Sequence, residues 1–301
     1  MSEDVVVSRK ESSTIVAMVR VERAQRLAIR WARQLLLNAL IAAGGIIMLL
    51  PLIWLAVSAA KPMEEIFTVP ITWIPKKFVF VENVRAVFKA VPFGRYYFNS
   101  VFVATSVTLM TLLFCSLAGF SFAHYNYPGR DALFLFVIAT MMIPFPIVVI
   151  PLFVIVKQLG MLDSYSALII PTAVSAFGVF LMRQFIMTIP SELIDAGRID
   201  GCSEPMIFSR IVVPLIKPAL ASLAIFTFLG NWGSFFWPLV VIGKDKYRTL
   251  PLGLTYFRSN YITYWNQLFA ASFLATVPVV IVFILFQGWF YKGMVMSGFK
   301  G

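Results

Sequence analysis

Long apolar runs separated by short polar segments dominate this chain. A helix needs about 20 mostly apolar residues to cross the hydrocarbon core of a bilayer, because each residue rises only about 1.5 Å. Runs of that length recur along the sequence. The predicted spans are Leu35–Ala60, Val101–Phe122, Ala132–Val156, Ala167–Met187, Pro218–Ile242 and Phe269–Phe290. The pattern therefore predicts an all-α, polytopic membrane protein with six transmembrane helices.

The charges at the start of the chain favour a cytoplasmic N-terminus. An even number of spans returns both termini to one side, and the tail before the first span is rich in arginine, which is typical of a cytoplasmic segment. Four arginines recur at spacings of three and four, so they would share one face of a helix. They are Arg23, Arg26, Arg30 and Arg33. We expect residues 1–34 to form a cytoplasmic tail with a basic amphipathic helix, and residues 35–301 to form the transmembrane domain.

The composition fits a membrane protein and argues against several other functions. Hydrophobic residues make up 60% of the chain, and its mean hydropathy is +0.86, well above that of soluble domains. The net charge of +11 is spread between the apolar runs, so we expect lipid headgroups and not nucleic acid as the counter-charge. Cys115 lies in an apolar run and Cys202 in a polar loop, which predicts no disulfide. The only histidine, His124, leaves no ligand set, so no metal is expected.

The predicted spans lack the groups that usually drive secondary transport. Secondary transporters commonly place carboxylates within the bilayer, but these spans contain no Asp or Glu. Arg183, near the inner end of the fourth span, is expected to extend its long side chain to water. His124 has no evident partner for acid–base chemistry, so no catalytic residue is expected. A secondary transporter or channel for a small solute stays as the alternative function.

The loop from Pro190 to Pro214 has the punctuation of two short helices joined by a glycine turn. Pro190 and Ser191 suit the start of a helix, and Gly201 suits a left-handed end. Ser203 is expected to cap the second helix. Pro214 is expected to break the chain before the fifth span.

One face of the first short helix is suited to docking. Its members follow the spacing of three and four, and two of them are small enough for another surface to approach closely. They are Leu193, Ala196, Gly197 and Asp200. Because a helix of about ten residues is marginal alone, we expect a cytoplasmic partner or the rest of the subunit to hold it.

This loop resembles the EAA loop of importer-type ABC permeases, where Glu-Ala-Ala, Gly and Ile-x-Leu-Pro follow at fixed spacings. The matching positions are Asp195-Ala196-Gly197, Gly201, Ile211, Val213 and Pro214. Segments 199–201, 214–220, 228–232, 237–239 and 300–301, together with Phe235, are similar to the carbohydrate, maltose-permease type. The resemblance covers about residues 35–301. The departures from the family pattern are Asp195 for Glu, Gly197 for the second Ala, and Gly233-Ser234 for Asn followed by an acidic residue.

The resemblance implies a type I ABC importer permease fold with a cytoplasmic coupling helix. In that family the loop docks on an ATP-hydrolysing subunit, so the implied partners are a second permease, two ATP-binding subunits, an external solute-binding protein and membrane lipid. ATP and Mg would bind the ATP-binding subunits, and this chain, which lacks a phosphate loop, would bind no cofactor. The implied function is import of a sugar or sugar-like solute across a bacterial cytoplasmic (inner) membrane, with both termini cytoplasmic.

Specific residues follow from the resemblance. The expected coupling-loop residues are Glu192, Asp195, Ala196, Gly197, Asp200, Gly201, Ile211 and Pro214. Residues expected near a translocation path between two permeases are Asn231, Trp232, Ser234 and Phe235, with plain helix packing as the alternative. The outer loop 243–268 is rich in Tyr and Trp, which suits either the membrane interface or a contact with the binding protein.

Overall fold

The computed structural model describes residues 3–258 and 263–298, with side chains described for residues 30–258 and 263–284. Within these ranges every regular element is a helix, and one isolated bridge joins Arg258 to Thr263. The all-α prediction is confirmed. The chain divides into a unit of residues 1–57 and a unit of residues 58–301.

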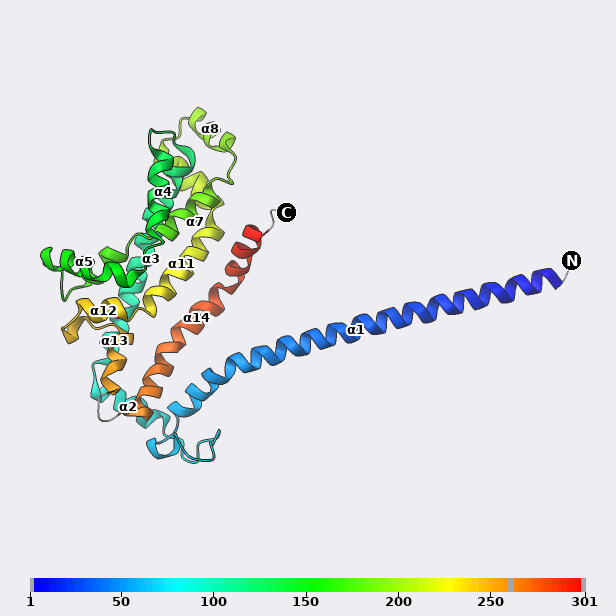
Figure 1. The fold of residues 1–301 in the computed structure, drawn as a ribbon, viewed down its shortest axis with the longest axis horizontal. Coiled ribbons are helices and arrows are strands. Elements are labelled where there is room, and N and C mark those ends of the chain that lie inside the picture. Colours follow the sequence, from blue (N-terminus) through cyan, green and yellow to red (C-terminus); the bar gives the residue numbers. More distant parts are fainter. Residues whose placement is uncertain (1–2, 259–262, 299–301) are drawn as a thin grey trace. The chain divides into compact units, whose positions relative to one another are not determined.

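The described part of the first unit belongs to helix α1 (Glu3–Ala59), which is continuous over 57 residues (Figure 1). Residues 30–59 of this helix are long and apolar enough to cross a membrane, in agreement with the first predicted span. Arg30 and Arg33 are exposed. Arg23 and Arg26, the other members of the predicted basic face, lie outside the described side chains.

The second unit contains two further long apolar helices and three bent helix pairs. The long helices are α3 (Phe93–His124) and α14 (Trp265–Gly298), and both α3 and residues Trp265–Ile284 of α14 are long and apolar enough to cross a membrane. The pairs are α4 (Arg130–Thr140) with α5 (Phe145–Gln158), Tyr165–Thr172 with α7 (Ala176–Ile186), and Glu204–Leu215 with α11 (Lys217–Trp232). Counting each pair as one span gives up to six in the described chain, as predicted.

Three predicted spans are nevertheless not single straight helices. The predicted span Ala167–Met187 bends by 42° between Thr172 and Ala176. The predicted span Ala132–Val156 bends by 103° between α4 and α5. Pro144 there has an extended backbone, and helix α4 ends before it because proline has no N–H to donate and clashes with a preceding helical turn. The predicted span Pro218–Ile242 is interrupted after α11 ends at Trp232, and α12 (Phe236–Val241) is a separate short helix.

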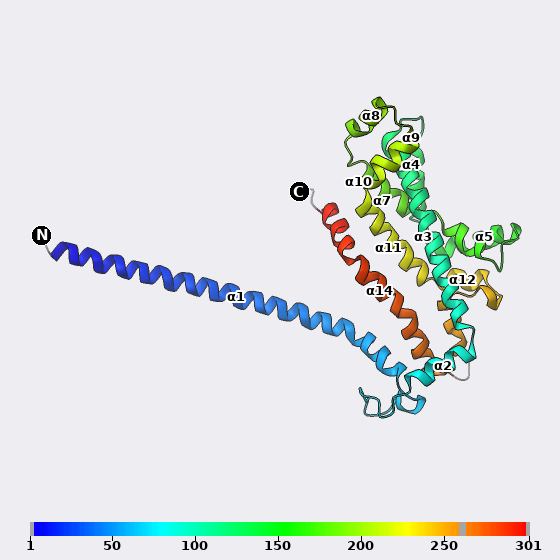
Figure 2. The same cartoon turned by 180° about the vertical axis from the view of Figure 1, so that it is seen from behind.

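Helix α3 lies at the centre of the packing in the second unit. It packs against α7 and α11, while α14 packs against α11 and α2 (Phe80–Ala90) (Figures 1 and 2). A Cβ atom at Gly119 of α3 would lie 2.6 Å from Cβ of Met182 on α7. A Cβ atom at Gly178 of α7 would lie 2.8 Å from Sγ of Cys115. Glycine at both positions therefore lets α3 and α7 approach closely.

The second unit has two ends, named here after the helices they carry. Helix α8 (Ser191–Ile199) lies at one end near α4, and α2 lies at the opposite end near α13 (Leu250–Leu254) (Figure 1). Apolar side chains around Met182 and Ile186 fill the α8 end, and those around Tyr96 and Trp232 fill the α2 end. The remaining elements are Met63–Glu65, α6 (Tyr165–Ile169), Ile170–Thr172, α9 (Glu204–Ile207), the π-helical turn Phe208–Val212, α10 (Val213–Leu215), Asp245–Tyr247 and Thr255–Phe257.

Candidate functional site

The loop 190–214 folds as a helix, a glycine turn and a second helix. Pro190 is the N-cap of α8, and Asp200 is its C-cap. Gly201 has φ of +78°, and its N–H donates to the carbonyl of Arg198. The N–H of Cys202 donates to the carbonyl of Gly197 at 2.9 Å. These two bonds form a Schellman motif, which requires the left-handed backbone that glycine adopts without strain.

The second half of the loop differs from the prediction in two details. Ser203 precedes α9, but its backbone carbonyl accepts from the N–H groups of Met206 and Ile207, while its side chain makes no cap hydrogen bond. Pro214 lies inside α10, and the 81° bend follows at Ile216. The chain is helical without a break from Glu204 to Leu215, and the π-helical turn Phe208–Val212 comes shortly before Pro214.

The structure divides the predicted docking face of α8 into two. Ile194 and Gly197 are buried against the rest of the chain, and a Cβ atom at Gly197 would lie 2.8 Å from Cδ1 of Ile211. Gly197 therefore packs against the rest of the subunit, which is one of the two partners expected for this face, and the coupling role of the face stays a prediction. The remaining three members, Leu193, Ala196 and Asp200, are exposed, as are the coupling-loop candidates Glu192 and Asp195. Helix α8 thus has a free surface that includes Leu193, with 46% of its area exposed.

A chain of polar contacts joins α8 to the end of α3. Arg198 donates from Nη1 to Oδ1 of Asp195 at 3.0 Å and from Nε to Oε1 of Glu204 at 2.9 Å. The hydroxyl of Tyr125, the residue after α3, donates to Oε2 of Glu204 at 2.5 Å. Burial raises the pKa of Tyr125 to about 12, and the hydrogen bond to the Glu204 carboxylate acts in the same direction. The phenol therefore stays protonated and keeps donating at neutral pH.

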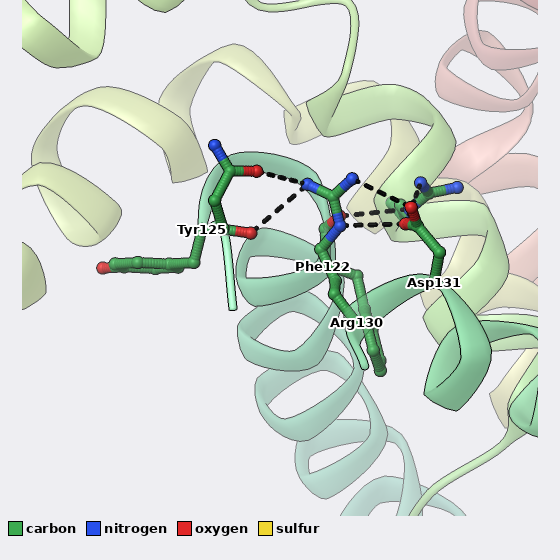
Figure 3. A network of polar contacts seen from close by, with 6 residues as sticks. Phe122, Tyr125, Arg130 and Asp131 are labelled. Atoms are coloured by element: carbon green, nitrogen blue, oxygen red, sulfur yellow. Dashed lines mark hydrogen bonds and ion pairs between the residues drawn. The ribbon is translucent and has the colours of Figure 1, made fainter. Parts of the chain in front are cut away.

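A second polar network lies in the neighbouring connection from α3 to α4 (Figure 3). Arg130 donates from Nε to Oδ1 of Asp131 at 2.9 Å and from Nη1 to Oδ1 of Asn126 at 2.9 Å. Arg183 of α7 donates from Nε to the carbonyl of Phe122 at 3.2 Å, and its Nη2 lies 4.0 Å from Asp131. Its guanidinium also lies 4.0 Å from the ring centroid of Phe134.

Arg183 is therefore held by neighbouring groups, whereas the sequence predicted a side chain extended to water. Only 16% of its side chain is exposed. The same side chain satisfies a carbonyl at the end of α3 and covers an aromatic face of α4, where a cation–π contact is favourable. Its contacts connect three helices at the α8 end.

The four candidates for a translocation path differ in their surroundings. Trp232 is buried, donates from Nε1 to the carbonyl of Ala275 at 3.1 Å, and packs edge-on against Tyr97. Asn231 donates from its side-chain nitrogen to the carbonyl of Thr227 at 2.8 Å in its own helix. Ser234 and Phe235 lie in the break between α11 and α12, with 39% of Phe235 exposed. The geometry favours helix packing for Trp232, and a role in the translocation path stays a prediction for the other three.

Buried polar groups fix the segment 243–250, which the sequence predicts to lie outside the membrane. The hydroxyl of Tyr96 donates to Oδ1 of Asp245 at 2.6 Å, and the side-chain nitrogen of Asn99 donates to the carbonyls of Lys246 and Arg248 at 3.0 and 2.8 Å. These bonds tie the segment to the start of α3. In the sequence, Tyr96 and Asn99 are recognisable as polar residues beside an apolar run. The sequence does not show which residues they contact.

A carboxylate forms a second attachment of this segment. Asp163 accepts from the backbone N–H groups of Gly243 and Lys244 at 2.6 and 2.7 Å, and these bonds hold the pKa of its carboxyl below the usual value. Its backbone lies in the left-handed region, with φ of 56°. Of the loop aromatics, Tyr256 and Tyr264 are exposed, Tyr247 packs edge-on against Tyr165, and Tyr261 lies outside the described residues.

Comparisons with known proteins match this architecture. Residues 112–296 match the family described as binding-protein-dependent transport system inner membrane component. The chain belongs to this family. The matched region contains the loop 190–214 and every helix from α4 to α12. The match therefore includes α8 and the helices packed near it, but not the part of α3 before residue 112.

Curated relatives align over most of both chains. The chain is 37% identical over 253 residues to the arabinooligosaccharides transport system permease protein AraQ of Halalkalibacterium halodurans, which covers 83% of this chain and 91% of that protein. It is 34% identical over 262 residues to the sn-glycerol-3-phosphate transport system permease protein UgpE of Yersinia enterocolitica, which covers 84% and 93%.

Solved structures share the fold. A bacterial ABC transporter involved in the import of the acidic polysaccharide alginate superimposes with a TM-score of 0.75 at 21% identity, covering 84% of this chain and 94% of that chain. A bacterial alginate ABC transporter in complex with an alginate pentasaccharide-bound periplasmic protein gives a TM-score of 0.58 at 17% identity. The predicted importer permease fold is confirmed.

Proposed function

We propose that this chain is one permease subunit of an ATP-driven ABC importer for a sugar or sugar-like solute. The proposal is carried by the exposed surface of α8. This short helix connects two of the bent helix pairs, and its residues Leu193 and Ala196 are not covered by the rest of the chain. Both relatives above are permease proteins, one for arabinooligosaccharides and one for sn-glycerol-3-phosphate, which supports a hydroxyl-rich solute.

In this proposal α8 docks on one of two ATP-binding subunits, and the α8 end is cytoplasmic. ATP and Mg bind those subunits, and this chain contributes no ATPase site. A second permease completes the translocation path, and an external binding protein delivers the solute. The alginate transporter supports this, because its structure was solved in complex with a pentasaccharide-bound periplasmic protein. The alternative is a secondary transporter or channel. It is disfavoured because neither would give the exposed surface of α8 a function.

Substitution at Ala196 tests the docking of α8. Ala196→Phe places a large ring on the exposed face without touching the chain's own core, because Ala196 is exposed. Lys89→Phe is the matched control, since Lys89 is exposed on α2 at the opposite end. We expect Ala196→Phe to lose copurification with the ATP-binding subunits and Lys89→Phe to keep it. Full assembly and uptake with Ala196→Phe would overturn the proposal.

Gly201→Val is a second test of docking, in which the defect arises from backbone strain and not from a bulky side chain on the exposed surface. Nothing lies within 4 Å of a Cβ atom at Gly201, so the substitution causes no crowding. It strains the backbone instead, because a β-branched residue resists a φ of +78°. We expect the Schellman turn to open, α8 to lose its orientation, and copurification to fall while membrane insertion is unchanged.

A further inference from the structure

Helix α3 is attached by side chains at both of its ends. At the α8 end, Tyr125 donates to Glu204, which Arg198 holds by a second bond. At the α2 end, Tyr96 and Asn99 bond to the segment 245–248. The 32 residues of α3 make a helix about 48 Å long, because each residue rises about 1.5 Å. One helix thus joins the candidate coupling loop to the outer loop.

We propose that Tyr125, Glu204 and Arg198 form a tie that transmits displacement of α8 to α3, and that α3 carries it to the loop 243–250. The inference rests on the proposed docking of α8 on an ATP-binding subunit. The three residues are positioning residues, since none of them would touch ATP or solute.

The geometry distinguishes this tie from ordinary packing of the loop. Ile194, Gly197 and Ile207 also hold α8, but apolar contacts are non-directional and permit sliding. The tie is directional, because a charged acceptor receives two donors from different elements at 2.5 and 2.9 Å. Among the described side chains, the bond from Tyr125 to Glu204 joins α9 directly to the residue that follows α3.

The tie contributes little to folding, which makes its role testable. The side chains of Arg198 and Glu204 are 39% and 43% exposed, and partly exposed ion pairs add little to stability. Removing the Tyr125 hydroxyl should therefore leave the subunit folded and assembled. The expected defect lies in the coupling of ATP hydrolysis to movement at the other end of α3.

The experiment uses the complete transporter in lipid nanodiscs and proteoliposomes. Tyr125→Phe removes the donor alone, and Glu204→Gln removes the charge that Arg198 and Tyr125 share. Tyr127→Phe is the matched control, because Tyr127 lies in the same connection and loses the same atom. Measurements are copurification with the ATP-binding subunits, the thermal unfolding midpoint, solute uptake per ATP hydrolysed, and the response of a fluorophore on a cysteine placed at Tyr256.

We expect Tyr125→Phe and Glu204→Gln to keep assembly and the unfolding midpoint but to lower uptake per ATP by at least about threefold, as loss of a charged hydrogen bond permits. The ATP-dependent signal at Tyr256 should weaken equally. The double variant should be no worse than the poorer single variant, because both changes break one tie.

Several results would overturn the inference. Unchanged uptake per ATP in Tyr125→Phe would do so, and so would an equal defect in Tyr127→Phe. Loss of assembly in Tyr125→Phe would show that the tie only folds the loop. Failure of the proposed function is separate, since it would appear as full assembly and uptake with Ala196→Phe.

Discussion

Gly197 on α8 faces Ile211 in the second half of the loop so closely that an added Cβ atom would lie 2.8 Å from Cδ1 of Ile211. The family pattern has alanine at the position of Gly197. In this chain the isoleucine side chain fills the space that a methyl group would need. The departure from the pattern therefore has a local cause in packing, and α8 is seated more tightly than its sequence alone indicates.

Substituting the two residues together should reveal this packing. Gly197→Ala gains helix propensity of about 1 kcal/mol but crowds Cδ1 of Ile211, whereas Ile211→Val removes that atom. In the wild-type background we expect Gly197→Ala to raise the free energy of unfolding by less than this propensity gain, or to lower it. In the Ile211→Val background we expect Gly197→Ala to raise it by the full propensity gain. Thermal unfolding of the four proteins in detergent measures the difference, and additive effects would show that the contact is absent.

A glycine near the C-terminal end of α3 offers a second test of close packing. A Cβ atom at Gly119 would lie 2.8 Å from the backbone nitrogen of Arg183, which cannot move without shifting α7. We expect Gly119→Ala to destabilise the subunit by about 1–3 kcal/mol, as overpacking does. Gly230→Ala in α11 is the control, because nothing lies within 4 Å of its added Cβ, and it should be neutral or stabilising. Equal unfolding midpoints for both variants would contradict the close approach of α3 and α7.

The sequence predicted features that depend on local backbone chemistry. Gly201 ends α8 as expected, because a Schellman turn needs a left-handed residue whatever surrounds it. Apolar length likewise predicted up to six spans. Pro144 and Pro146 indicate a kink in the third predicted span, but the sequence does not give its angle, so the 103° size of the bend before Phe145 was not predicted.

Contacts between distant residues were beyond a sequence argument. Tyr125 and Glu204 are 79 positions apart, and Asp163 and Gly243 are 80 apart. Which side of α8 Gly197 occupies also depends on tertiary packing, since a spacing of three or four includes residues on both edges of a helical face. The pairing of Arg183 with Phe122 and Asp131 was missed for the same reason.

The attachment of the outer loop by Asp163 should depend on pH. The pKa of this carboxyl is lower in the folded protein than its unfolded value of about 3.9, because the ionised form accepts the N–H groups of Gly243 and Lys244. Stability from this site is therefore fully present above the unfolded pKa and is lost as pH falls through the folded pKa. Asp163→Asn keeps a residue that tolerates a positive φ and removes the charge.

Unfolding midpoints of wild type and Asp163→Asn, measured from pH 3 to pH 7, test this dependence. We expect wild type to be more stable at neutral pH and the difference to shrink below about pH 4. A difference that stayed constant across the range would show that the charge of Asp163 does not contribute.

The orientation of the chain remains a prediction, and labelling of single cysteines tests it. Ser203 is exposed at the α8 end and Tyr256 is exposed in the outer loop, so cysteines at these positions are accessible in the folded subunit. Cys202 is partly exposed and must first be replaced by serine, whereas Cys115 is buried inside α3 and can stay. If the arginine-rich tail and α8 are cytoplasmic, a membrane-impermeant maleimide added to intact cells will modify the cysteine at Tyr256 and spare the one at Ser203 until the cells are opened. The reverse pattern would invert the topology and remove the physical basis for docking α8 on a cytoplasmic ATP-binding subunit.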